Sequence, residues 1–153
     1  MKYSPSKLNS FLMFKVPAAF ISGVRVREVS PSRCCVTVRH RWINQNPFRS
    51  MYFAVQAMAA ELSTAVPVMT QISASGKNIS MLILANRSTF SKKATGRITF
   101  TCLPGNVVSE ALQRAITTGE GQTFWLTSVG ENEKGDRVST IEFEWTIRVK
   151  SPS

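Results

Sequence analysis

Apolar residues recur along this chain with spacings that predict both strands and helices. Segments in which apolar and polar residues alternate are typical of strands that bury one face. These segments are Val24–Val29, Cys34–Arg41, Arg97–Leu103, Thr123–Val129 and Val138–Val149. Helices are predicted over residues 5–14, Ser50–Val66 and Val107–Thr117. Proline or glycine follows each of these three helices, as expected where a helix ends.

The helix predicted over Ser50–Val66 is unusual because it has no charged face. Between Ser50 and Gly76 the sequence holds one formally charged side chain, Glu61. A helix of this kind is normally buried on most of its sides. An ionised carboxylate is costly in such surroundings, so we expect Glu61 to be neutralised, paired or used for function.

The segment Ile79–Ala85 is apolar at both odd and even positions, which is typical of a strand covered on both faces. A single chain of 153 residues would leave one of these faces in contact with water. The sequence therefore predicts a homo-oligomer, either a homodimer or a dimer of dimers.

The order of elements predicts one α+β domain over residues 1–153, with strands arranged around a single dominant buried helix. The length suits one domain with a proper core and is short for two. The formal charge is +10, from 19 Lys and Arg against 9 Asp and Glu. This excess favours an anionic partner, whether nucleic acid, an acidic membrane surface or a small molecule bearing phosphate.

The cysteines and the histidine limit the chemistry that we expect. Cys34, Cys35 and Cys102 are odd in number and two are adjacent, so we expect free core residues and a cytoplasmic location. His40 is the only histidine and has no cluster of ligands, so no metal and no other cofactor is predicted. Lys15 and Pro17 interrupt the apolar run near the N-terminus, and no membrane span is predicted.

The stretch from Asn46 to Glu61 resembles the signature of hotdog acyl-CoA thioesterases of the phenylacetate-degradation type. Asn46 matches the loop Asn of that family, Ala54 a Gly at the helix start, and Glu61 the helix carboxylate. Two positions depart from the pattern: Tyr52 replaces the usual His, and Arg49 replaces a common Gly. The chain looks closest to the uncharacterised thioesterase-like branch. This resemblance implies a hotdog fold, a mostly antiparallel sheet wrapped around one long central helix.

The resemblance also implies a role for the carboxylate and for the start of the helix. Glu61 would be a general base for water, or a nucleophile, at a thioester carbonyl. Its alternative is to pair with a sheet arginine across a subunit interface, or to bond to the next helix. The backbone amides of Phe53 and Ala54 would hold the oxyanion, with Asn46 orienting the thioester oxygen. In the alternative, Asn46 only closes a turn before Pro47.

Four further side chains have expected roles in such a site. The Tyr52 hydroxyl would donate to the acyl carbonyl in place of imidazole, or would simply pack as an aromatic. Gln56 is expected on the same broad helix face as Glu61, where it would position water or the carbonyl. Thr64 would contact Glu61 at helical spacing, or only pack. Arg49 is the first candidate to bind the coenzyme A diphosphate.

Three functions follow from these features. The first is hydrolysis of an acyl-CoA or a related acyl thioester. The second is a non-catalytic acyl-binding module with the same pocket, which the Tyr52 substitution favours. The third is a basic nucleic-acid-binding protein, which we do not favour because the sequence has no recognition motif. Basic residues could instead hold the phosphates of coenzyme A, and the candidates are Arg25, Arg27, Arg39, Arg41, Lys92, Lys93 and Arg97.

Overall fold

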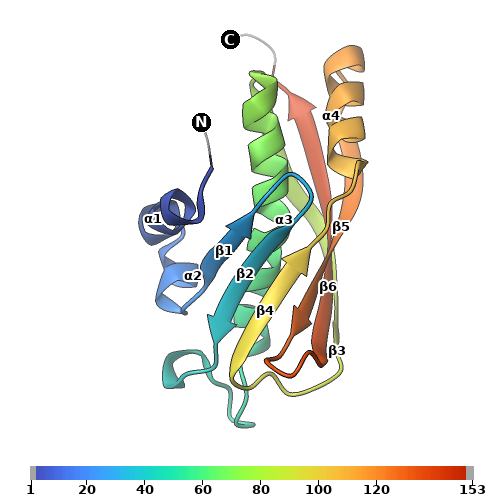
Figure 1. Ribbon diagram of the computed structural model, residues 1–153. Coiled ribbons are helices and arrows are strands. Elements are labelled where there is room, and N and C mark those ends of the chain that lie inside the picture. Colours follow the sequence, from blue (N-terminus) through green and yellow to red (C-terminus); the bar gives the residue numbers. More distant parts are fainter. Residues whose placement is uncertain (1–2, 151–153) are drawn as a thin grey trace.

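The computed structural model describes residues 3–150 and confirms the α+β class, with an antiparallel sheet around one long helix (Figure 1). The helices are α1 (Pro5–Lys15), α2 (Pro17–Ile21), α3 (Phe53–Ser75) and α4 (Val107–Thr118), with one 3-10 turn, η1 (Trp42–Asn44). The strands are β1 (Arg25–Val29), β2 (Cys34–Arg39), β3 (Ile79–Phe90), β4 (Arg97–Cys102), β5 (Gln122–Glu131) and β6 (Arg137–Val149). They form one sheet in the order β1-β2-β4-β5-β6-β3, with each neighbouring pair antiparallel.

One face of this sheet forms the core together with α3, which packs on β2, β4, β5 and β6. The alternating pattern of β6 explains how the strand does this. Four of its apolar side chains lie on the buried face, and they are Ile141, Phe143, Trp145 and Ile147. The polar residues between them lie on the outer face, where water or a ligand can reach them.

The N-terminal helices close the β1 end of the sheet. Leu8 and Leu12 of α1 are buried in the core. The Asn9 side chain accepts from the Val26 amide at 2.9 Å and donates to the Val26 carbonyl at 3.0 Å, so α1 satisfies an edge strand. Pro17 follows the end of α1, as the sequence indicated, and it also opens the short helix α2, because proline is well tolerated in a first helical turn.

The central helix is longer than predicted and shifted along the chain. It begins at Phe53 and passes through Pro67 to Ser75, where Gly76 ends it with a φ of 65°. A proline inside a helix costs about 3 kcal/mol. Burial of Val66, Pro67 and Val68 offsets this cost, and tertiary packing therefore overrides the stop signal. None of the described helices is long and apolar enough to cross a membrane.

Strand β3 is also longer than predicted and forms one edge of the sheet. It pairs with β6 alone, over the register from Ile79 opposite Val149 to Phe90 opposite Ser139. Within the single chain, Leu82 and Leu84 are 62% and 52% exposed. This chain alone therefore does not cover both faces of β3, and the predicted oligomer stays a prediction.

The three cysteines are free and buried, as expected for sheet residues. Cys34 and Cys102 lie opposite each other on β2 and β4. Burial raises the pKa of both thiols to about 12, so neither is a reactive thiolate near neutral pH.

Candidate active site at the start of the central helix

Asn46 organises the loop that leads into α3. Its side-chain oxygen accepts hydrogen bonds from the backbone amides of Phe48 and Ser50, at 2.9 and 3.3 Å. Its amide group donates to the Met51 carbonyl at 3.3 Å and lies 3.1 Å from the Ser50 hydroxyl. These bonds occupy the polar atoms of Asn46 within the loop. The structure thus gives Asn46 a positioning role there.

Arg49 lies at the tip of the same loop in a left-handed conformation, with a φ of 60°. It is the only residue other than glycine with positive φ in the described chain. This conformation favours glycine, which explains why a glycine suits this position in the family pattern. The Arg49 side chain is exposed and forms no ion pair within residues 3–150, so its guanidinium is available to an anion.

The first turn of α3 presents unused backbone donors. Tyr52 is the N-cap residue, and no side chain caps the helix. The first two helical amides, of Phe53 and Ala54, have no intrahelical partner and no other backbone partner in the described chain. The loop itself is held firmly, because Met51 donates to the Ala94 carbonyl and Tyr52 to the Asn44 carbonyl, each at 2.8 Å.

A pocket of about 690 Å³ opens beside this helix start. Its walls come from the loop of residues 46–51, the first turn of α3 and the segment of residues 90–94. An aromatic cluster forms one side, with ring centroids 5.1 Å apart for Tyr52 and Phe53 and 6.2 Å apart for Phe53 and Phe90. The lining is mainly apolar, as suits an acyl chain. We call this cavity the α3 pocket.

Gln56 is a buried polar residue of the α3 pocket. Its side chain is only 4% exposed, and its Oε1 atom has no hydrogen-bond partner in the structure. A buried amide without a partner costs free energy, so a ligand or a water molecule is expected to satisfy it. Gln56 is therefore the predicted site residue whose chemistry most clearly calls for a ligand inside this pocket.

Glu61 lies outside the α3 pocket, further along α3. Within the described chain its carboxylate has neither an ion pair nor a side-chain hydrogen bond, and burial raises its pKa to about 7. Ala54, Ala57 and Met58 are partly exposed on the same side of the helix. The expectation that Gln56 shares this face is wrong, because five residues of an α-helix turn through about 140°.

Thr64 holds the turn of α3 that carries Glu61. It is fully buried, and its hydroxyl donates to the Glu61 backbone carbonyl at 2.8 Å. The same hydroxyl accepts from the Trp145 indole at 3.1 Å, which ties α3 to β6. The expected contact with Glu61 thus exists, but it goes to the backbone and not to the carboxylate. Thr64 lines no pocket found in the described chain.

Two lysines, Lys92 and Lys93, line the α3 pocket. Lys93 donates to the Phe48 carbonyl at 3.0 Å, and Lys92 pairs with Asp136 at 2.7 Å. Sequence reasoning did not connect these lysines to Arg49, since more than forty residues separate them. Arg25, by contrast, is occupied: its guanidinium donates to the Phe20 and Val24 carbonyls.

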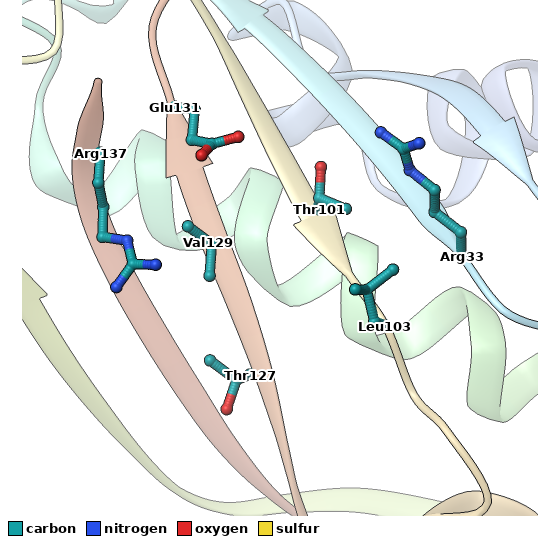
Figure 2. A pocket seen from close by; sticks show the side chains of 7 residues that line it. All are labelled: Arg33, Thr101, Leu103, Thr127, Val129, Glu131 and Arg137. Carbon is teal, nitrogen blue, oxygen red and sulfur yellow. The ribbon is translucent and has the colours of Figure 1, made fainter. Parts of the chain in front are cut away.

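A second pocket, of about 480 Å³, lies on the outer face of the sheet. Figure 2 shows Arg33 and Arg137 at its two sides, with Glu131 and Thr101 between them and α3 behind the strands. None of the predicted site residues lines this pocket. Within residues 3–150 no three His, Cys, Asp or Glu side chains come together as a metal site would require.

Comparison with known proteins agrees with this fold. Residues 6–147 match the family described as "Domain of unknown function (DUF4442)". A Pseudomonas aeruginosa protein of unknown function, described as a probable thioesterase, superposes with a TM-score of 0.81 at 20% identity, covering 96% of this chain and 97% of that chain. A thioesterase from Haemophilus influenzae superposes with a TM-score of 0.77 at 11% identity, covering 97% and 93%.

A third structure, a protein of unknown function from Chlorobaculum tepidum, superposes with a TM-score of 0.82 at 12% identity, covering 95% of this chain and 94% of that chain. No curated protein matches the sequence. These similarities confirm the hotdog fold, and the family match confirms the branch of unknown function that the sequence indicated.

Proposed function

We propose that this chain, which belongs to the DUF4442 family and has a hotdog fold, hydrolyses an acyl thioester of the acyl-CoA type. The observation that carries this proposal is Glu61. It is a partly buried carboxylate with no partner in the described chain and a pKa of about 7. A base whose pKa lies near the working pH is suited to take a proton from water.

In the proposed reaction, the amides of Phe53 and Ala54 donate hydrogen bonds to the thioester oxygen. Glu61 removes a proton from water, and the hydroxide oxygen forms a bond to the carbonyl carbon. The oxyanion then collapses, the carbon–sulfur bond breaks, and the leaving thiolate takes the proton from Glu61. The products are a carboxylic acid and the free thiol.

Within one chain, Glu61 and the amides of Phe53 and Ala54 do not face the same cavity. Glu61 follows Phe53 by eight residues, a rise of about 12 Å along the helix axis, and it lies outside the α3 pocket. We therefore propose that a second copy, joined along the edge strand β3, completes the site. One chain would then supply the amides and Gln56, and its partner would supply Glu61.

The other side chains act on the acyl group and the carrier. The Gln56 carboxamide would bind a water molecule or, after rotation, donate to the carbonyl oxygen. The Tyr52 hydroxyl, on a half-exposed side chain at the pocket mouth, would donate to the substrate. Arg49 would bind the phosphates of coenzyme A, and Asn46 would hold the loop. The buried free thiols suit a reducing compartment, and we place the protein in the cytoplasm.

The test is a panel of acyl-CoA esters, with release of free thiol as the measurement. Glu61→Gln is expected to keep the fold and to lower turnover by roughly 10²–10⁴, the usual contribution of a general base. Glu110→Gln, an exposed carboxylate on α4, is the matched control and should leave turnover unchanged. Wild-type turnover in Glu61→Gln would show that Glu61 is structural.

A non-catalytic acyl-binding module is the second candidate. It is favoured by the separation of Glu61 from the α3 pocket and by the engagement of Asn46 within its loop. This candidate predicts saturable binding of acyl-CoA with no thiol release above the uncatalysed rate. It also predicts that Glu61→Gln binds the ligand as tightly as the wild-type protein.

A further inference from the structure

Four large apolar side chains project into water from the N-terminal elements. Phe14 at the end of α1 is 74% exposed, and Ile21 at the end of α2 is 62% exposed. Trp42 and Ile43 of η1 are 82% and 52% exposed. Isolated exposed apolar residues are common, but four large ones from adjacent segments mark an interaction surface.

These segments are held together by the fold. Asn44 is buried, and its amide donates to the Ser22 carbonyl at 2.9 Å and to the Arg39 carbonyl at 2.8 Å. This side chain therefore ties η1 to the end of α2. Figure 1 shows α1, α2 and the η1 segment gathered at the β1 end of the sheet, away from β3.

Phe14 lies on the face of α1 opposite the face that packs in the core. Leu8 and Leu12 supply the buried face of α1, while Phe14 points away from it, half a turn round the helix from Leu12. Asn9 fixes this orientation through its two hydrogen bonds to Val26. The fold thus presents Phe14 outward on a helix that cannot easily rotate.

The surroundings of these side chains are strongly basic. Lys7, Lys15 and Arg41 are exposed and form no ion pair within the described residues. The first sixty residues hold nine Lys and Arg against a single acidic residue, Glu28. Most of the net positive charge of the protein therefore belongs to this part of the chain. We call these three basic residues, with Phe14, Ile21, Trp42 and Ile43, the N-terminal surface.

We propose that the N-terminal surface docks on an anionic lipid bilayer. Trp and Phe occupy the interface between headgroups and acyl chains, while Lys and Arg contact the anionic headgroups around them. In this arrangement the protein would lie on the surface of the bilayer, with its apolar side chains inserted among the headgroups. This inference is independent of the proposed hydrolysis.

Charge and composition argue against the other occupants. A second copy of the same surface would bring like charges together without any acidic residue to pair with them. Nucleic acid would satisfy the charges and could stack on Trp42, but it would not bury Ile21 and Ile43. A bilayer satisfies both the basic and the aliphatic side chains.

The experiment is co-sedimentation of the full chain with vesicles of phosphatidylcholine, alone or mixed with phosphatidylglycerol. We expect binding to the anionic vesicles to exceed binding to the neutral ones by about tenfold or more, and to weaken at high salt. Trp42 is the most exposed tryptophan, so its fluorescence should shift to shorter wavelength on binding. The absence of binding to anionic vesicles would overturn the proposal.

Two pairs of variants separate the apolar part from the charged part. Phe14→Ser with Trp42→Ser should weaken vesicle binding by about tenfold or more, because apolar contact is lost. Leu103→Ser, at a residue 69% exposed in the outer pocket, is the matched control and should not change it. Lys15→Glu with Arg41→Glu should remove the preference for anionic vesicles, whereas Lys134→Glu in the β5–β6 hairpin should not.

Two outcomes would assign the surface to another partner and so overturn the proposal. One is binding to a mixed-sequence oligonucleotide that is lost in the Glu variants and kept in the Ser variants, with no vesicle binding. The other is a smaller sedimenting assembly in the Ser variants with unchanged vesicle binding. All the substituted side chains are exposed, and thermal unfolding of each variant confirms that the fold is retained.

Discussion

At the scale of single residues, α3 carries two polar side chains that the chain itself does not satisfy. Within residues 3–150, the Gln56 oxygen buried in the α3 pocket has no hydrogen-bond partner, and the Glu61 carboxylate, whose pKa is raised, has no ion pair. Neither arrangement stabilises the fold. Both are intelligible if a ligand or a second chain completes them, which is why they carry the proposed function.

The raised pKa of Glu61 makes stability depend on pH in a defined direction. Below its ordinary pKa of 4.5 the carboxyl is protonated in both the folded and the unfolded chain, so it costs nothing. As the pH rises toward about 7, the Glu61 carboxyl ionises in the unfolded chain before it ionises in the folded protein, and the free energy of unfolding falls. Compared with Glu61→Gln, the wild-type protein should lose about 2 kcal/mol of its free energy of unfolding over this pH range, a value that allows for the partial exposure of Glu61.

Urea unfolding of both proteins between acid and mildly alkaline pH measures this difference. The difference in free energy of unfolding between the wild-type protein and Glu61→Gln should grow as the pH rises, and it should reach its full size above the pKa of Glu61 in the folded protein. A gap of opposite sign would mean that Glu61 is held as an anion by an arginine, as in the interface pairing that the sequence also allowed. In the thioesterase assay, kcat/KM should rise through the same pH range, since only the ionised base is active.

Arg49 is expected to recognise the nucleotide end of the substrate. Arg49→Ala should raise KM for an acyl-CoA, more so at low salt, and leave KM unchanged for a short acyl thioester that lacks the nucleotide. Arg114→Ala, at an exposed arginine of α4, is the control. Equal effects of Arg49→Ala on both substrates would mean that Arg49 shapes the pocket instead of binding phosphate.

At the scale of elements, the packing of β5 between β4 and β6 depends on a glycine in β5, Gly130, which has no side chain. A Cβ atom at Gly130 would lie 2.6 Å from the Phe100 ring and 2.9 Å from the Ser139 hydroxyl. Gly130→Ala should therefore lower the free energy of unfolding by about 1–3 kcal/mol, the usual cost of overpacking. Gly121→Ala is the matched control, because its Cβ would meet only the Ile147 carbonyl, at 3.8 Å. Equal denaturation midpoints for the two variants would contradict this reading.

Elements that are marked by a sequence pattern within their own segment were predicted well from the sequence. The alternation of β6 identified its buried face, and the Gly119 stop signal placed the end of α4 within one residue. The end of α3 was wrong because burial of the Pro67 region decides it, and burial depends on the whole fold. The same reason explains β3, whose second half is held by pairing with β6 and not by an apolar pattern.

The sequence predicted only the part of the candidate site that comes from one continuous segment of the chain. Asn46, Tyr52 and Gln56 do line one pocket, as their closeness along the chain suggested. Gln56 and Glu61 lie about 140° apart around α3, and the fold determines that the Gln56 side lines the α3 pocket while the Glu61 side does not. Phe90 was missed because only the fold brings the end of β3 to the start of α3.

At the scale of the whole molecule, the proposed site requires two chains. The edge of β3 is free, Leu82 and Leu84 are exposed on it, and the α3 pocket lacks a carboxylate. We expect sedimentation to give a dimer or a dimer of dimers at micromolar concentration. Leu82→Glu with Leu84→Glu should yield a folded monomer with little activity, whereas Leu103→Glu should sediment as the wild-type protein does.

Mixing two inactive variants tests whether each site is shared between chains. Glu61→Gln removes the base, and Phe53→Pro removes one oxyanion donor at a first helical position, where proline fits because Tyr52 has a φ of −59° and a ψ of 133°. In a mixed dimer, one of the two sites joins the intact amide of one chain to the intact Glu61 of the other. Refolding an equal mixture should restore about a quarter of wild-type activity, since half the dimers are mixed and half of their sites are intact. Phe53→Ala, which keeps the amide and loses only the ring, separates the effect of the donor from that of the aromatic cluster. If the mixture stays as inactive as its parts, base and donors come from the same chain.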